Sequence, residues 1–165
     1  MKSTIFKILV FLFAITIALG LYFYYRVPPK INLSGLTLEN LEGQKIDNGL
    51  FEGKLLVLSF YQSWCGPCIG EMNSLEELSV NFKDEILVLC VSDEEIEKQK
   101  NVAMRFSRGN IYFLNTKVPF KEIGIHTFPT NYVFDKNGVL KYEKTAPEDW
   151  SSEKMIKQIN EWKLE

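Results

Sequence analysis

Two cysteines separated by two residues stand where an apolar run ends and an amphipathic run begins. Lys54 to Tyr61 reads KLLVLSFY, a nearly uninterrupted apolar stretch with the length of a buried strand. Trp64-Cys-Gly-Pro-Cys68 follows, and the apolar residues from Gly66 to Phe82 recur at helical spacing. A strand that passes into a helix at a Cys-x-x-Cys pair predicts alternating strands and helices, with redox or metal chemistry at the junction.

The position of the pair predicts different roles for its two thiols. Cys65 would lie at the helix N-terminus, where backbone N–H groups and the helix dipole favour an anion, so it is the expected nucleophile. Cys68 lies one turn further in and is the expected resolving thiol, which attacks the mixed disulfide. Pro67 suits a first helical turn because its missing N–H is not needed there, and Gly66 leaves the sulfur approachable. Trp64 is expected to shield the thiol while staying partly exposed.

A metal site is one alternative for such a pair. A structural zinc ion needs two more ligands, and the chain offers only Cys90 and His126, neither in a paired spacing, so no metal is expected. A copper-handling role, with Cys65, Cys68 and His126 binding a soft metal ion, is the second hypothesis. A binding protein with an incidental redox pair is the third. Cys90 lies inside an apolar strand and is expected to be buried and inert.

Composition excludes several other classes. The chain has 165 residues, which suits one compact domain. Its net charge of −2 provides no basic field, so nucleic acid is not an expected partner. Three cysteines are too few for a disulfide scaffold, and a single histidine excludes His-rich zinc sites.

The segments around the pair predict the rest of the fold. Residues 31–50 carry short apolar alternations between glycines, which indicate a small hairpin. Further strands are predicted at 85–91, 111–114, 130–135 and 139–143, and Ser92-Asp-Glu-Glu95 is predicted to cap a helix as a capping box. A last helix follows residue 152. This order predicts an α/β fold with a central mixed sheet flanked by helices, an N-terminal β-hairpin extension and an N-terminal transmembrane helix.

Three segments carry a family resemblance. They are GKLLVLSFYQSWCGPC at 53–68, CIGEM at 68–72 and IHTFPT at 125–130 with YVFDKNGVL after it. They resemble the membrane-anchored thioredoxin-like proteins of the TlpA/ResA type, and the resemblance covers about residues 31 to 165. It implies a thioredoxin-like fold and a protein thiol–disulfide oxidoreductase. Its redox-active group would be a Cys65–Cys68 disulfide, and it would need no other cofactor.

The resemblance also implies further residues and partners. Pro129 would be a cis-proline facing the cysteine pair, and Phe128 and Thr130 beside it would bind substrate, the backbone of Phe128 pairing with an extended segment. The implied partners are proteins with disulfides and a membrane thiol electron donor. The Gly66-Pro67 dipeptide resembles that of reducing members, which favours a reductase of envelope protein disulfides, for instance in cytochrome c maturation.

One position departs from thioredoxin. Thioredoxins carry a buried aspartate six residues before the first cysteine, and this chain has Ser59 there. A hydroxyl does not accept a proton as a carboxylate does near neutral pH. Glu71 is the nearest acid that could assist Cys68, but the expected reading of Glu71 is a solvated charge in the first turns of the helix. His126 could tune Cys65, touch substrate or lie on the surface, the last being favoured.

The amino-terminal part of the chain has a different composition. From Ile8 to Tyr25 there are 18 residues without a charge. As a helix they would span about 27 Å, close to the hydrocarbon thickness of a bilayer. Extension of the run to residue 5 crosses only Lys7, which can snorkel. We therefore expect a membrane anchor over residues 5–25, with a signal peptide cleaved near Ala18-Leu19-Gly20 as the alternative.

The charges around this run indicate an orientation. Two lysines and the terminal amine precede it, whereas one arginine and one lysine follow it before residue 31, which favours an amino terminus in the cytoplasm. The expected protein is single-pass in a bacterial cytoplasmic (inner) membrane, with its catalytic domain on the extracytoplasmic (periplasmic) side. Residues 1–30 would be the anchor and a proline-containing spacer, and residues 31–165 the thioredoxin-like domain.

Overall fold

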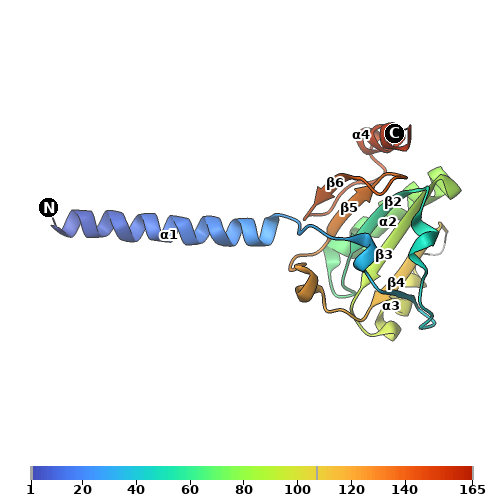
Figure 1. Cartoon of the computed structure of the whole chain (residues 1–165), viewed down its shortest axis with the longest axis horizontal. Coiled ribbons are helices and arrows are strands. Elements are labelled where there is room, and N and C mark those ends of the chain that lie inside the picture. The colour runs from blue at the N-terminus through green and yellow to red at the C-terminus, as the bar shows by residue number, and fades with distance from the viewer. Residues whose placement is uncertain (1, 107, 165) are drawn as a thin grey trace.

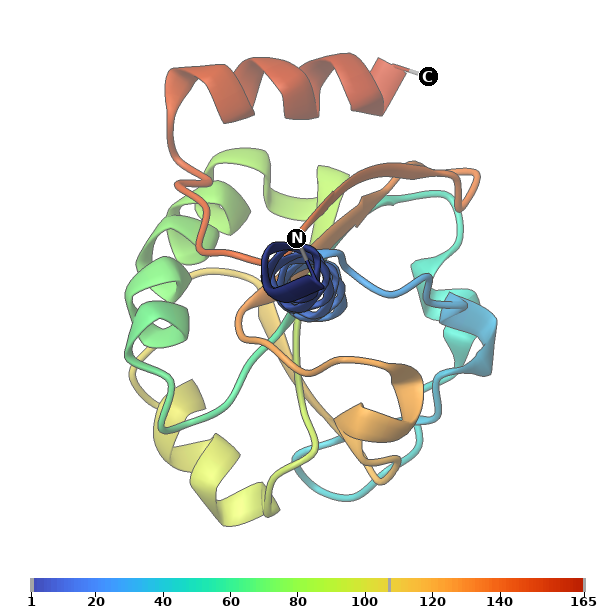
Figure 2. The same ribbon diagram turned by 90° about the vertical axis from the view of Figure 1, so that its left-hand side faces the viewer.

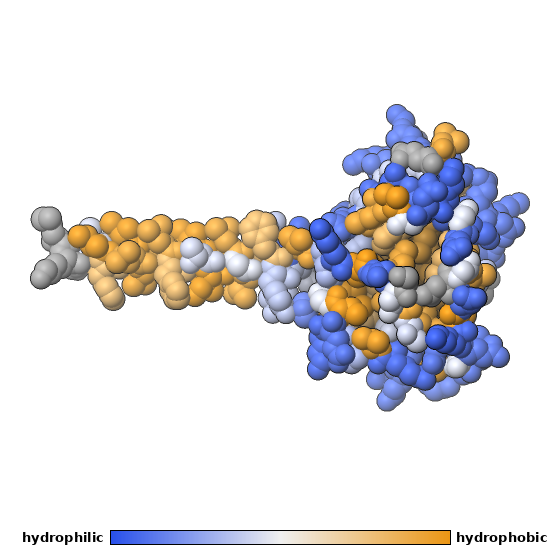
Figure 3. Space-filling model, viewed as in Figure 1, coloured by the Kyte–Doolittle hydropathy of each residue, from blue (hydrophilic) through white to orange (hydrophobic). Residues whose placement is uncertain are grey.

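The chain consists of one long helix and a folded α/β unit (Figure 1). The computed structural model describes residues 2–106 and 108–164. Helix α1 (Lys2–Arg26) extends away from the rest, with exposed apolar side chains along its length. In the view of Figure 3 its surface is mostly hydrophobic, whereas the α/β unit shows hydrophilic margins around hydrophobic patches. By length and composition, Thr4–Arg26 could cross a membrane.

A six-stranded sheet forms the centre of the α/β unit. Its spatial order is β1-β4-β3-β2-β5-β6. Strands β2, β3 and β4 are parallel to one another, whereas β1, β5 and β6 pair antiparallel, so the sheet is mixed as predicted. The strands are β1 (Leu38–Asn40), β2 (Leu55–Phe60), β3 (Ile86–Ser92), β4 (Ile111–Thr116), β5 (Thr130–Phe134) and β6 (Leu140–Lys144). The predicted N-terminal hairpin is present in a short form: Glu39 of β1 pairs with Lys45 in an antiparallel bridge, and the Ile46 N–H donates to the Leu38 carbonyl at 2.8 Å.

The two faces of the sheet are covered differently. Helices α2 (Gly66–Phe82), α3 (Ile96–Ala103) and α4 (Glu153–Leu164) all contribute to the core cluster on one face. The connections β2–α2–β3 and β3–α3–β4 both move the chain toward the β1 edge of the sheet. Because such connections are right-handed, α2 and α3 lie on the same face of the sheet. The core cluster on the opposite face is covered by the segment around Leu36 and by the 3₁₀ turn η4 (Phe120–Ile123). Figure 2 shows these helices and turns around the sheet.

The start of α3 differs from the capping-box prediction. Ser92 is the last residue of β3 and is fully buried, and its Oγ accepts the Glu94 N–H at 3.2 Å within the connecting loop. The N-cap of α3 is Glu95, whose side chain makes no capping hydrogen bond. The prediction was wrong because Ser92 is still part of the buried strand β3 and therefore does not lie at the start of the helix.

Gly109 offers a test of packing between the β4 entrance and α2. A Cβ atom there would lie 2.0 Å from Ser79 Oγ and 3.0 Å from the Glu76 carbonyl oxygen. We expect Gly109→Ala to cost about 2 kcal/mol and to lower Tm by about 6 °C, because the backbone must move to admit the methyl group. The matched control is Gly70→Ala in α2, where a Cβ meets nothing within 4 Å, and it should leave Tm unchanged or raised. Thermal unfolding of the detergent-solubilised chain measures both, and equal Tm values would contradict the prediction.

Candidate active site

The cysteine pair forms a disulfide at the N-terminus of α2. Cys65 and Cys68 are bonded, with their Cα atoms 5.3 Å apart. Cys65 is the N-cap residue of α2, and its Sγ accepts the Cys68 N–H at 3.2 Å. A thiolate on Cys65 would therefore meet a backbone donor and the positive end of the helix dipole. Cys65 is 4% exposed and Cys68 1%, an order that agrees with Cys65 as the outer sulfur.

Exposed residues surround the outer sulfur. Trp64 is 72% exposed, more than the sequence led us to expect, and its ring lies edge-to-face with Phe128 at 6.1 Å between centroids. Gly66 and Pro67 are also exposed, and a Cβ at Gly66 would meet nothing within 4 Å. The disulfide is therefore buried, and the exposed residues Trp64, Gly66 and Pro67 form a rim beside it.

The loop before β5 lies next to this rim. The Phe128–Pro129 peptide bond is cis, as the family resemblance implies. Thr130 begins β5 and pairs with Phe60 at the end of β2, the strand that leads into the cysteine pair. The Thr130 hydroxyl donates to the Thr127 carbonyl at 2.7 Å, which closes the loop. The sheet therefore brings Phe128, Pro129 and Thr130 to the end of β2 from which the cysteine pair continues.

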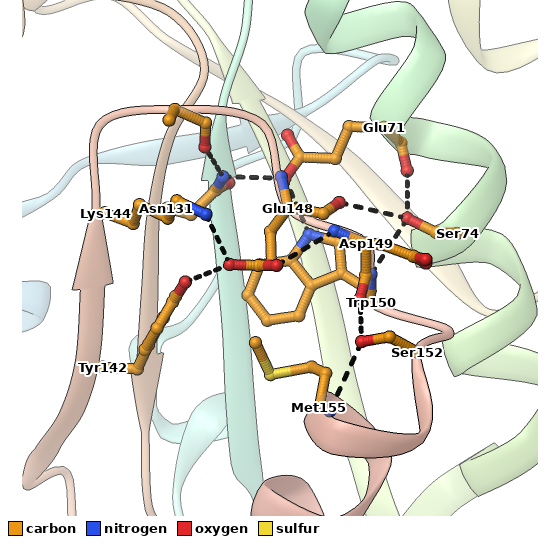
Figure 4. Close-up of polar contacts among 11 residues, drawn as sticks. Glu71, Ser74, Asn131, Tyr142, Lys144, Glu148, Asp149, Trp150, Ser152 and Met155 are labelled. Carbon is orange, nitrogen blue, oxygen red and sulfur yellow. Dashed lines mark hydrogen bonds and ion pairs between the residues drawn. The ribbon is translucent and has the colours of Figure 1, made fainter.

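Glu71 is buried, so the expectation of a solvated charge was wrong. Its side chain belongs to the inward face of α2, because position 71 follows Cys68 by three residues and precedes Leu75 by four. Glu71 is 4% exposed. Its Oε1 accepts three hydrogen bonds: from Trp150 Nε1 at 2.8 Å, Asn131 Nδ2 at 2.8 Å and the Glu148 N–H at 2.9 Å (Figure 4). The helical spacing from Cys68 was the signal that could have found it.

The sheet register relates Glu71 to the position where thioredoxins carry an aspartate. Ser59 is flanked by Asn131 on β5 and by Cys90 on β3. The side chain of Asn131 reaches Glu71 from this row. A carboxyl group carried by the helix therefore lies beside the strand position that carries an aspartate in thioredoxins.

Comparison with known proteins agrees with this geometry. A family model described as Redoxin matches residues 26–159, most of the chain. The chain belongs to the Redoxin family. The thioredoxin-like α/β fold implied by the resemblance is confirmed by this match and by solved structures. One of these is a secreted Mycobacterium tuberculosis disulfide oxidoreductase homologous to E. coli DsbE. It has a TM-score of 0.62 at 17% identity, and the match covers 77% of this chain and 95% of that chain.

Two curated relatives extend the comparison within the Redoxin family. The thioredoxin-like protein YneN of Bacillus subtilis (strain 168) is 29% identical over 111 residues, 64% of each chain. The thiol-disulfide oxidoreductase ResA of Bacillus thuringiensis subsp. konkukian (strain 97-27) is 30% identical over 107 residues. That match covers 63% of this chain and 62% of the relative. The chain thus spans a little under two thirds of the length of these relatives.

The surroundings of Glu71 in this Redoxin chain favour its neutral form. Burial raises the pKa of Glu71 from its ordinary 4.5 to about 7, and the nearby charge of Glu148 adds to the rise. The three hydrogen bonds on Oε1 lower the pKa but only partly offset the burial. Among the described residues, Glu71 Oε2 and Asn131 Oδ1 have no hydrogen-bond partner. A proton on Oε2 would convert one of these two acceptors into a donor.

Two acidic residues after β3 hold the loop that precedes Cys65. Asp93 accepts hydrogen bonds from Gln62 Nε2 at 2.6 Å and from the Phe120 N–H at 2.8 Å. Glu94 accepts from both the backbone N–H and the hydroxyl of Ser63, the latter at 2.9 Å. These contacts tie the active-site loop of the Redoxin fold to β3 and to η4. The sequence predicted helix-capping roles for this segment and missed this one.

Cys90 and His126 both lie outside the immediate surroundings of the disulfide in the sequence, and their positions differ in burial. Cys90 is a free, fully buried thiol, and burial raises its pKa far above the ordinary value, as expected of an inert cysteine. His126 is partly exposed and contacts Tyr24 of α1. Within the described part of the chain, no group of three or more His, Cys, Asp or Glu side chains is placed to hold a metal ion.

Proposed function

We propose that this Redoxin protein is a membrane-tethered thiol–disulfide oxidoreductase that reduces protein disulfides outside the cytoplasm. The observation that carries the proposal is the Cys65–Cys68 disulfide at a helix N-terminus, next to an exposed rim and a cis-proline loop. Trp64, Gly66, Pro67 and Pro129 would shape the approach to Cys65. Relatives named as thiol–disulfide oxidoreductases support the same chemistry.

The first step forms a mixed disulfide. In the reduced protein the Cys65 thiolate attacks one sulfur of a substrate disulfide, so that a Cys65–substrate S–S bond forms and the substrate S–S bond breaks. The released substrate thiolate takes up a proton. The Cys68 N–H and the helix dipole stabilise the attacking thiolate, and the backbone of Phe128, with Thr130 beside it, would align the substrate segment.

The second step releases the substrate. The Cys68 thiol loses its proton, attacks Cys65 Sγ and frees the second substrate thiolate, which is protonated in turn. Glu71 would accept the Cys68 proton, since it follows Cys68 by one turn on the same buried face and has a pKa of about 7. Two electrons have then passed to the substrate, and the protein holds the disulfide. A thiol electron donor in the membrane would reduce it again by the reverse exchange.

The location is proposed from the amino-terminal helix. Residues 5–25 would cross the bacterial cytoplasmic membrane once, and the unit from residue 31 onward would face the periplasmic side. The uncharged length of α1 and its exposed apolar surface support this placement. A reductase held there could supply reduced cysteines to envelope proteins, cytochrome c precursors being one example.

A trapping experiment tests the function. In the Cys68→Ser variant the first step can occur but the second cannot, so a mixed disulfide between Cys65 and its substrate should accumulate and be identifiable by mass spectrometry. The matched control is Cys65→Ser, which leaves only the inner thiol of the pair, 1% exposed, and should trap little. Equal trapping by both variants, or adducts carried by Cys90, would contradict the proposed roles.

A further inference from the structure

Helix α1 ends against the loop that carries Pro129. The Tyr24 ring stacks on the His126 ring with 4.6 Å between centroids, and Tyr24 Oη lies 2.8 Å from His126 Nε2. The Thr127 hydroxyl donates to the Tyr25 carbonyl at 2.9 Å. Figure 2 looks along α1 and shows the orange loop crossing beside its end. The last turn of α1 thus contacts the two residues that precede Phe128.

The spacer between α1 and the α/β unit is also attached. Two consecutive prolines, Pro28 and Pro29, restrict its backbone. The hydroxyl of the buried Tyr132 donates to the Pro29 carbonyl at 2.7 Å. A Cβ on Gly124, at the base of the loop, would come within 3.0 Å of the Pro29 side chain. The spacer therefore packs on the same loop instead of serving as a flexible tether.

The loop connects these contacts to the disulfide. Phe128 follows His126 by two residues, and its ring meets Trp64, the residue before Cys65. The end of α1 and the rim of the active site therefore lie on one face of the α/β unit. They are linked by the ring contact of Tyr24 with His126 and by that of Phe128 with Trp64. Tyrosines at the end of a membrane span lie at the membrane–water interface, so this face would be turned toward the bilayer.

We propose that α1 and the spacer hold the Pro129 loop so that Cys65 meets disulfides of membrane-tethered polypeptides close to the bilayer surface. His126 and Tyr24 then set where the α/β unit lies relative to the bilayer and take no part in the chemistry at Cys65. The inference rests on the function proposed above. A thiol mounted rigidly next to the bilayer has a high effective concentration for disulfides within its reach, and a low one for disulfides carried further out.

Single-turnover reduction of peptides in liposomes tests this inference. The full chain, reduced beforehand and freed of reductant, is mixed with single-span peptides that carry a disulfide loop on a Gly/Ser stalk. Stalks of about 4 and about 36 residues would reach about 11 and about 33 Å from the bilayer. We expect the short-stalk peptide to be reduced about tenfold faster. The rate on a soluble peptide with the same disulfide loop measures the thiol–disulfide exchange without any effect of the membrane.

Two variants and one control separate the possible causes. Tyr24→Ala, and separately a Gly-Ser insertion between Arg26 and Val27, should bring the rate ratio close to one without changing the rate on the soluble peptide. Tyr22→Ala is the matched control, because Tyr22 lies on the same helix with the same 56% exposure and its ring meets Phe23. A wild-type ratio near one, or a ratio that both altered chains retain, overturns the inference. Failure of the wild type on the soluble peptide would instead overturn the proposed function.

Discussion

The Glu71→Gln variant is expected to resolve the mixed disulfide about a hundredfold more slowly than the wild type at pH about 7, because general-base assistance contributes roughly 10²–10⁴-fold. Glutamine keeps an oxygen for the three donors on Oε1 but cannot accept the Cys68 proton. Attack by Cys65 should change little. Rapid quenching with an alkylating agent separates the two steps, since it captures the mixed disulfide as it forms and decays.

The pH profile distinguishes lost proton transfer from lost structure. As the pH rises, hydroxide from solution increasingly replaces Glu71 as the acceptor of the Cys68 proton, so the defect of Glu71→Gln should shrink. Glu77→Gln is the matched control, because Glu77 lies on the same helix but is exposed. A resolving step that is unaffected at neutral pH, or a defect that is equally large at every pH, would exclude Glu71 as the proton acceptor.

The same residue should make stability fall as the pH rises. The pKa of Glu71 is about 7 in the folded protein against 4.5 as its ordinary value, so the folded state holds the proton more tightly. This contribution is fully present below pH 4.5 and is lost as the pH rises to about 7. At about 1.4 kcal/mol for each pKa unit, the loss is about 3 kcal/mol.

The difference between wild type and Glu71→Gln isolates this contribution. The glutamine variant should match the wild type near pH 4 and exceed it by about 3 kcal/mol near pH 8, because a neutral amide needs no deprotonation in the buried site. Other groups titrate in both proteins and cancel. Asp135, whose pKa is lowered by hydrogen bonds from Val139 and Asn137 despite burial, is one of them. Denaturant unfolding at several pH values measures the difference, and a constant difference would contradict the pKa of Glu71.

Local patterns in the sequence predicted the architecture around the disulfide. The apolar run of β2 and the helical spacing after Gly66 placed the strand, the helix and the cysteine pair correctly, and α2 spans Gly66–Phe82 as predicted. These features depend on residues close together in the chain. The disulfide needs only the three-residue offset of Cys65 and Cys68 at a helix start.

Contacts between distant segments were beyond such patterns. The burial of Glu71 depends on Asn131 and Trp150, which follow it by 60 and 79 residues. His126 meets Tyr24 across 102 residues. Periodicity along the chain identifies which face of an element is apolar, because neighbouring residues create that face. Which polar group meets a buried carboxyl, or which loop meets the anchor, follows from how finished elements pack, and distant side chains become neighbours only in the folded molecule.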